Sequence, residues 1–122
     1  MSRFDGDCDV TFVRLASYEG TESSNTVREL MGLNMDVEDR TIVIVEDIID
    51  SGLTMLMAKD KLKAAGAKDV LIATLLYKPK AFKHHYYIHY VGIEIPNDFI
   101  IGFGLDYDGK GRNLRDIYKI AE

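Results

Sequence analysis

Cysteine is almost absent from this sequence, since Cys8 is the only one in 122 residues. A single cysteine excludes an intrachain disulfide and a metal cluster built from cysteines. The amino-terminal residues lack the apolar stretch of a secretory signal, and no apolar run is long enough to span a bilayer. These absences predict a cytoplasmic protein that does not associate with membranes.

Positive charge is also scarce, because 15 Lys and Arg residues stand against 20 Asp and Glu residues and leave a net charge of -5. This balance argues against broad attraction to nucleic acid, although a local cationic pocket for a small phosphate ligand is compatible with it. The hydrophobic fraction of 47% is typical of a folded globular chain. Without repeats or linkers, residues 1–122 are predicted to form a single domain.

The middle of the chain alternates apolar runs with a helical pattern. Residues 41–45 (TIVIV) are continuously apolar, which is typical of a strand buried on both faces. From Thr54 apolar residues recur at helical spacing, and Gly66 is placed to end the helix. Residues 69–78 again favour a strand, so this stretch predicts a βαβ unit with a right-handed crossover.

The flanking segments carry shorter signals. Residues 10–16 predict a strand, and a polar segment from Tyr18 to Leu30 predicts a long loop. Further strands are expected over 87–92 and 99–103, followed by a short terminal helix or strand. The fold class is therefore α/β, with a mainly parallel sheet flanked by helices and ligands bound at the carboxyl ends of its strands.

One segment, IVIVEDIIDSGLTM, concentrates the groups that could hold a ligand. Ser51 and Gly52 allow close backbone approach, and the hydroxyls of Ser51 and Thr54 stand beside the N–H groups of a helix start, where a phosphate could bind. Glu46 and Asp47 could accept hydrogen bonds from sugar hydroxyls, directly or through a hydrated Mg2+. The segment predicts a site for an anionic ligand that contains a ribose.

Each of these residues also has a purely structural interpretation. Asp50 or Ser51 could merely cap the helix, and the two preceding carboxylates could be solvated in a turn. The complete set, in this order and directly after an apolar strand, favours the binding site.

This order resembles the signature of the phosphoribosyltransferase family, in which an apolar strand, two acidic residues and a glycine-containing phosphate loop follow one another, here as VIVEDIIDSGLT. Within that family the resemblance is closest to the hypoxanthine-guanine phosphoribosyltransferases. It covers nearly the whole chain through residues 13–18, 75–80 and 91–109 and Arg112. It implies the type I phosphoribosyltransferase (Rossmann-like) fold.

The resemblance implies a reaction of purine salvage. Ribose 5-phosphate would pass from phosphoribosyl pyrophosphate to the 6-oxopurine base hypoxanthine or guanine, giving the nucleoside monophosphate IMP or GMP and pyrophosphate. Asp50 would be the catalytic acid or base at the purine N7. Mg2+ would be the cofactor, and family members commonly form dimers or tetramers.

The resemblance further assigns binding roles to the matching residues. The 5′-phosphate would be held by Asp50, Ser51, Gly52, Leu53 and Thr54, and the ribose by Glu46 and Asp47. The purine would be bound by Lys78 at O6, by Phe99 as a stacking platform, and by Ile100 and Asp106. Arg112 would contact pyrophosphate, Ser17 and Tyr18 would head a loop that closes over the reaction centre, and the metal would be held by Glu46, Asp47 and Asp106.

The chain departs from the family in its amino-terminal part. The first core strand and the loop that engages pyrophosphate in the family have no counterpart upstream of residue 10, so a truncated domain is expected. A missing strand would leave an open sheet edge, which the chain could cover by pairing with itself. We expect the nucleotide half-site to be kept and catalysis to be weak or absent.

Two other classes of protein share some of these features. A receiver domain also has an acidic pair after an apolar strand and a Lys-Pro after a later one, here Lys78 and Pro79, but Glu46, Asp47 and Asp50 crowd a single turn instead of separate strands. A non-catalytic module that binds phosphoribosyl pyrophosphate or a nucleotide as a regulator is the second alternative. The acidic balance and the lack of a recognisable DNA-binding segment speak against coupling to nucleic acid.

Overall fold

A computed structural model describes residues 1–13 and 35–121 of the chain. The chain divides into two compact units. The first unit comprises Met1–Ile44 and Leu53–Ile72, and the second comprises Val45–Gly52 and Ala73–Glu122. No helix in the described residues is long and apolar enough to cross a membrane.

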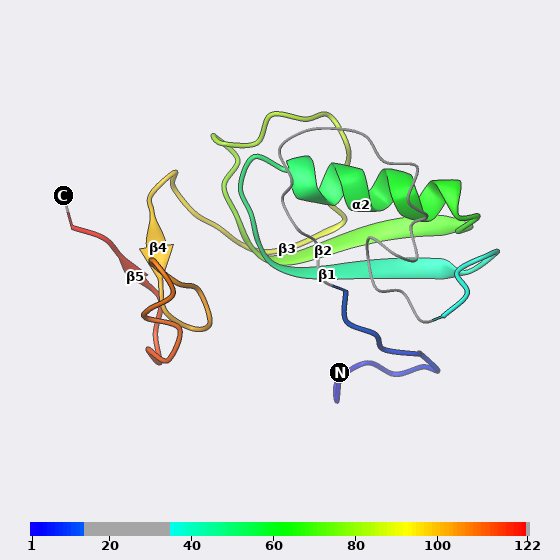
Figure 1. The fold of residues 1–122 in the computed structure, drawn as a ribbon, viewed down its shortest axis with the longest axis horizontal. Helices are drawn as coiled ribbons and strands as arrows, with labels where there is room; N and C mark the ends of the chain where they lie inside the picture. Colours follow the sequence, from blue (N-terminus) through cyan, green and yellow to red (C-terminus); the bar gives the residue numbers. More distant parts are fainter. Residues whose placement is uncertain (14–34, 122) are drawn as a thin grey trace. The chain divides into compact units, whose positions relative to one another are not determined.

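Three strands form the main sheet, β1 (Thr41–Ile49), β2 (Asp69–Tyr77) and β3 (Tyr90–Glu94), in the order β1-β2-β3 (Figure 1). Strands β2 and β3 pair in parallel, with Ala73 opposite Tyr90 and Tyr77 opposite Glu94. The predicted α/β fold with a parallel sheet is confirmed.

Backbone hydrogen bonds tie β1 to β2 at both of their ends. In the first unit the Lys68 N–H, just before β2, donates to the Arg40 carbonyl, just before β1, at 2.9 Å. In the second unit the Lys78 N–H, just after β2, donates to the carbonyl of Ile49, the last residue of β1, at 3.1 Å. The two strands therefore run in the same direction, and their carboxyl ends meet at one edge of the sheet.

Helix α2 (Leu53–Ala64) connects β1 to β2. It ends just before Gly66, the predicted stop, and Gly66 adopts a φ of 96° that favours glycine. The Gly66 N–H donates to Lys63 O at 3.0 Å and the Ala67 N–H donates to Leu62 O at 3.1 Å, which is the bonding pattern of a Schellman cap. Strand, helix and strand thus form the expected βαβ unit.

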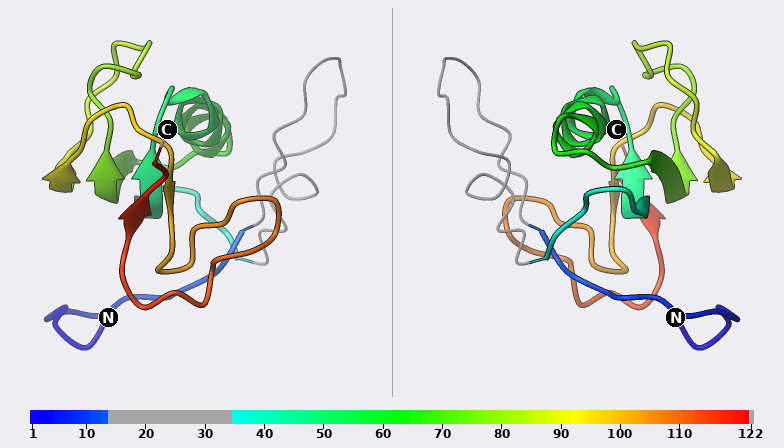
Figure 2. Two further views of the ribbon diagram at one scale, coloured as in Figure 1. Left: turned by 90° about the vertical axis from the view of Figure 1, so that its left-hand side faces the viewer. Right: turned by 90° about the vertical axis from the view of Figure 1, so that its right-hand side faces the viewer.

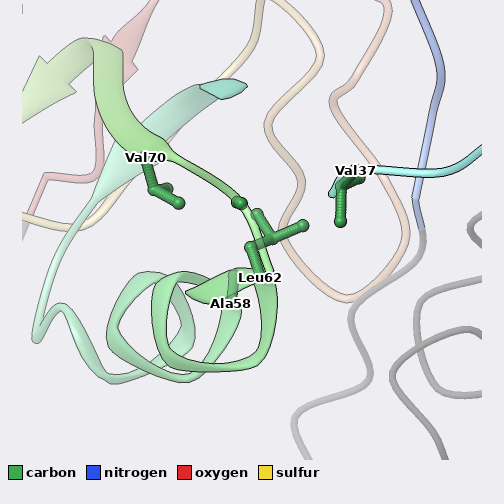
Figure 3. Packing of buried hydrophobic residues seen from close by; sticks show 5 residues of the cluster. Val37, Ala58, Leu62 and Val70 are labelled. Atoms are coloured by element: carbon green, nitrogen blue, oxygen red, sulfur yellow. The ribbon is translucent and has the colours of Figure 1, made fainter. Parts of the chain in front are cut away.

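The core of the first unit lies where α2 packs on the sheet. Ala58 and Leu62 project from α2 toward Val70 of β2, and Val37 approaches from the segment before β1 (Figure 3). Ala67 completes the buried cluster, and Ile42 and Ile44 of β1 pack against it. Each fully buried Val or Leu side chain contributes roughly 1.5–3 kcal/mol.

The expectation that β1 spans 41–45 and is buried on both faces is wrong. The strand continues to Ile49, and its side chains alternate between more and less exposed positions. In the first unit α2 covers one face only (Figure 2), so Val43 on the opposite face is exposed. Val45, in the second unit, is 75% exposed.

The carboxyl-terminal part of the second unit contains the antiparallel pair of β4 (Ile100–Ile101) and β5 (Tyr118–Lys119). The strand expected over 99–103 is therefore shorter, the terminal element is a strand, and the strand expected over 87–92 lies at Tyr90–Glu94. Residues 10–13 form no strand, and the remainder of the strand expected over 10–16 lies outside the described residues.

Candidate functional site

Two adjacent carboxylates lie near the carboxyl end of β1, inside the strand and not after it as expected. Glu46 is partly buried and Asp47 is exposed. The Asp47 N–H donates to Glu46 Oε1 at 3.2 Å, and the Ile48 N–H donates to Asp47 Oδ1 at 2.7 Å. Burial, and then the hydrogen bond and negative charge of Asp47, raise the pKa of Glu46 to about 7. Glu46 can therefore hold or release a proton near neutral pH, whereas a bound cation would favour its charged form.

A tight turn, Asp50 to Gly52, follows β1 and leads into α2. Gly52 is buried and has a φ of 88°, a conformation that other residues adopt only with strain. Leu53 and Thr54 follow directly in the chain as the first residues of α2 and belong to the first unit. A helix start offers backbone N–H groups and the positive end of the helix dipole to an anion.

The second unit places Lys78 and Asp50 in contact, although they are 28 positions apart in the sequence. Lys78 Nζ donates to Asp50 Oδ2 at 3.2 Å, with the lysine side chain only 7% exposed and the aspartate 57% exposed. Lys78 therefore does not extend its charge into water from the strand end. Its ammonium is directed at the turn, and Asp50 still presents its carboxylate to solvent.

A second group of predicted residues surrounds β4. Arg112 forms an ion pair with Asp106, with Nη2 to Oδ1 at 3.0 Å, and also donates from Nη1 to the Gly104 carbonyl at 2.8 Å. Phe99 is exposed over about half of its surface and meets the Tyr107 ring edge-to-face, with centroids 5.6 Å apart. Ile100 lies within β4, opposite Lys119.

Six of the residues predicted from the sequence thus form three contacting pairs, Glu46 with Asp47, Lys78 with Asp50, and Arg112 with Asp106. Ser17 and Tyr18, the residues assigned to a closing loop, lie outside the described residues.

Sequence reasoning missed an aromatic segment that covers the turn. This segment runs from Phe82 to His89, and none of its residues belongs to the set predicted from the sequence to form the site. In the structure the Tyr86 hydroxyl donates to the Gly52 carbonyl at 2.6 Å, and the Lys83 N–H donates to the Ser51 carbonyl at 3.1 Å. No sequence pattern joins Tyr86 to a glycine 34 positions earlier, so this contact could be found only from coordinates.

Three carboxylates, Glu46, Asp47 and Asp106, are predicted to hold a divalent cation. Among the residues that the structure describes, no group of three or more His, Cys, Asp and Glu side chains forms a metal site. Glu46, Asp47 and Asp106 therefore do not converge on one ion. The neighbouring Glu46 and Asp47 still fit Mg2+, because this ion commonly takes one or two carboxylates and completes its octahedron with water and substrate phosphate.

The sequence matches a known protein family. A family model described as "Phosphoribosyl transferase domain" matches residues 1–108. The chain is 44% identical over 104 residues to the hypoxanthine-guanine phosphoribosyltransferase of Mycobacterium avium, which covers 84% of this chain and 51% of that protein. It is 41% identical over 115 residues to the enzyme of the same name from Streptococcus thermophilus, and the match covers 93% of this chain and 64% of that protein.

Solved structures of similar proteins have the same fold. The hypoxanthine-guanine phosphoribosyltransferase of Leishmania tarentolae in complex with GMP is 36% identical, with a TM-score of 0.67 over 70% of this chain and 51% of that chain. The hypoxanthine phosphoribosyltransferase of Trypanosoma cruzi in complex with the product IMP is 34% identical, with a TM-score of 0.69 over 75% of this chain and 50% of that chain. The chain spans about half the length of several of the relatives it matches.

Proposed function

The chain belongs to the phosphoribosyl transferase domain family, and on this premise we propose that it binds 6-oxopurine nucleoside monophosphates and contributes to their synthesis from phosphoribosyl pyrophosphate. The reaction joins ribose 5-phosphate to N9 of hypoxanthine or guanine and releases pyrophosphate. Membership of this family removes the receiver-domain alternative. Relatives named for this activity, two of them in complexes with GMP and IMP, support the proposal.

The observation that carries the proposal is the Lys78–Asp50 pair at the carboxyl ends of β2 and β1. A 6-oxopurine presents two neighbouring atoms, O6 and N7, on one edge. An ammonium can donate to O6, which is only an acceptor, and an adjacent carboxyl group can receive or return a proton at N7. A donor and a proton carrier 3.2 Å apart match that edge.

The turn beside this pair suits the 5′-phosphate of the same nucleotide. Asp50 to Gly52 lead into the first residues of α2, and the sequence here carries the hydroxyls of Ser51 and Thr54 beside the backbone N–H groups of a helix start. These donors and the helix dipole favour a dianionic group. Glu46 and Asp47, on the strand just before the turn, would accept hydrogen bonds from the ribose hydroxyls.

The residues around β4 would bind pyrophosphate and the purine ring. Arg112 would contact pyrophosphate, and its present partner Asp106 would orient it. Phe99 would stack on the base, and the backbone of Ile100 would bind its edge. Ser17 and Tyr18 remain predicted to close over the reacting atoms.

Mg2+ would be held by Glu46 and Asp47 together with water and substrate oxygens, and when bound it would neutralise charge on the pyrophosphate. The chain's own residues position the base and the sugar, exclude water and move the N7 proton through Asp50. No covalent intermediate with the protein is required.

Calorimetric titration with IMP and GMP in the presence of Mg2+ tests the binding half of this proposal. Thr54→Ala removes one hydroxyl donor to a charged group, so we expect affinity to fall about tenfold or more, the equivalent of roughly 1.5–3 kcal/mol. Asp60→Asn, on an exposed position of the same helix, is the matched control and should bind as the native chain does. Absence of IMP binding by the native chain would refute the proposal.

Turnover separates an enzyme from a binding module. With hypoxanthine and phosphoribosyl pyrophosphate, Asp50→Asn should keep nucleotide binding while losing roughly 100-fold or more in kcat, because a general acid or base typically contributes 10²–10⁴. A native chain that binds IMP but produces none would leave the binding module as its function.

A further inference from the structure

The segment that follows β2 folds back over the turn that follows β1. It makes two backbone-directed hydrogen bonds there, from the Lys83 N–H to the Ser51 carbonyl at 3.1 Å and from the Tyr86 hydroxyl to the Gly52 carbonyl at 2.6 Å. The Phe82 ring lies directly against the Gly52 α-carbon, so closely that a Cβ at this position would collide with ring carbon Cε2. The backbone carbonyls of Ser51 and Gly52 are thus both held by the same segment.

Aromatic packing keeps the Tyr86 hydroxyl in place. Its ring meets Phe82 edge-to-face, with centroids 5.1 Å apart, and stacks with His84 at 6.1 Å. Phe82 in turn meets Tyr77, at the end of β2, edge-to-face at 5.5 Å. Burial, and then the charge of Tyr77, raise the pKa of Tyr86 to about 12. The hydroxyl is therefore protonated, and able to donate, throughout the physiological pH range.

Holding the Gly52 carbonyl also fixes the direction of the next N–H. A trans peptide group is planar, and its C=O and N–H point in opposite directions. The chain contains no cis peptide bond in the residues described. A hydroxyl that anchors the Gly52 oxygen on the side of Tyr86 therefore directs the Leu53 N–H away from that side, at the first residue of α2.

We propose that Tyr86 is a positioning residue for phosphate binding, which orients the Gly52–Leu53 peptide group through its hydrogen bond to the Gly52 carbonyl while Phe82 closes the space behind Gly52. The inference rests on the proposed function, in which this turn binds the 5′-phosphate. It assigns a role to residues outside the strand, turn and helix that form the site. Tyr86 does not touch the ligand itself.

The proposal predicts an effect confined to the phosphate. Tyr86→Phe keeps the ring and removes only the hydroxyl, so affinity for IMP and for ribose 5-phosphate should fall about three- to tenfold, as for loss of one hydrogen bond. Affinity for inosine, which lacks the phosphate, should be unchanged. Tyr87→Phe removes a hydroxyl from an exposed neighbour and should leave the affinity for each of the three ligands unchanged. Ligand-observed NMR can measure weak binding and is therefore suited to all three compounds.

The ratio of IMP affinity to inosine affinity decides the outcome, since a general loosening of the fold would weaken both ligands. A Tyr86→Phe chain with the native ratio would overturn the positioning role and leave the proposed function intact. A native chain that binds no IMP would overturn the proposed function and this inference together. Thermal unfolding of Tyr86→Phe, expected to stay close to the native transition, checks that the variant is folded.

Discussion

The turn after β1 and the segment 98–119 around β4 and β5 share two features, a glycine at positive φ and a Lys–Asp ion pair, but differ in enclosure. Gly52 is packed against Phe82 and Tyr86, whereas a Cβ added to Gly104 would meet nothing within 4 Å. Lys78 is 7% exposed beside Asp50, whereas Lys119 is 65% exposed beside Asp98. The glycine and the ion pair are therefore held rigidly in the turn after β1, whereas those of segment 98–119 have room to move. A fixed arrangement suits recognition of a purine edge and a phosphate, because little order must be imposed when the ligand arrives.

The glycines give the largest expected difference between the two regions. Gly52→Ala combines backbone strain at a φ of 88° with a collision against an aromatic ring, so we expect a loss of about 3 kcal/mol in the free energy of unfolding. Gly104→Ala has a φ of 93° but open space, and strain alone costs about 1–2 kcal/mol. Urea unfolding measures both, and equal losses would contradict the enclosure of Gly52.

The ion pairs give the next difference. Asp50→Ala leaves the buried Lys78 ammonium without this carboxylate, at a cost of about 2 kcal/mol in the free energy of unfolding. Asp98→Ala leaves Lys119 in water, so its loss should be at most about 1 kcal/mol. If the two alanine variants unfold at the same urea concentration, burial of Lys78 does not distinguish the pairs.

The sequence predicted the elements of the first unit better than the contacts of the second. Periodicity located α2, Gly66 and the strands on either side, because a helix or strand depends on its own residues. The sequence also suggested Lys78 and Asp50 separately. Their pairing depends on where two strands end in space, and the Tyr86–Gly52 bond on how a long connection folds back, so neither has a local signal.

The titration of Glu46 gives the smallest expected effect on the free energy of unfolding. Its folded pKa, about 7, lies above the ordinary value of 4.5. Between these values the folded chain binds more protons than the unfolded chain, so this group's contribution favours folding below about pH 4.5 and is lost as pH rises through 7. Because the group is only partly buried, screening reduces the effect to about 1 kcal/mol.

Glu46→Gln should remove this dependence. Relative to the native chain, the variant should gain stability between pH 5 and pH 8, whereas Glu94→Gln, at an exposed position of β3, should show no such gain. Urea unfolding at about pH 5 and 8 measures both. A constant difference between native and Glu46→Gln chains across this range would argue against a raised pKa for Glu46.

The comparison of IMP with AMP tests most directly whether Lys78 and Asp50 form a 6-oxopurine site. AMP carries the same ribose 5-phosphate but presents an amino donor where IMP presents O6. We predict that the native chain binds IMP about tenfold or more tightly than AMP, and that Lys78→Met abolishes the preference mainly by weakening IMP. Equal affinity of the native chain for the two nucleotides, or an unchanged preference in Lys78→Met, would contradict the assignment of this site.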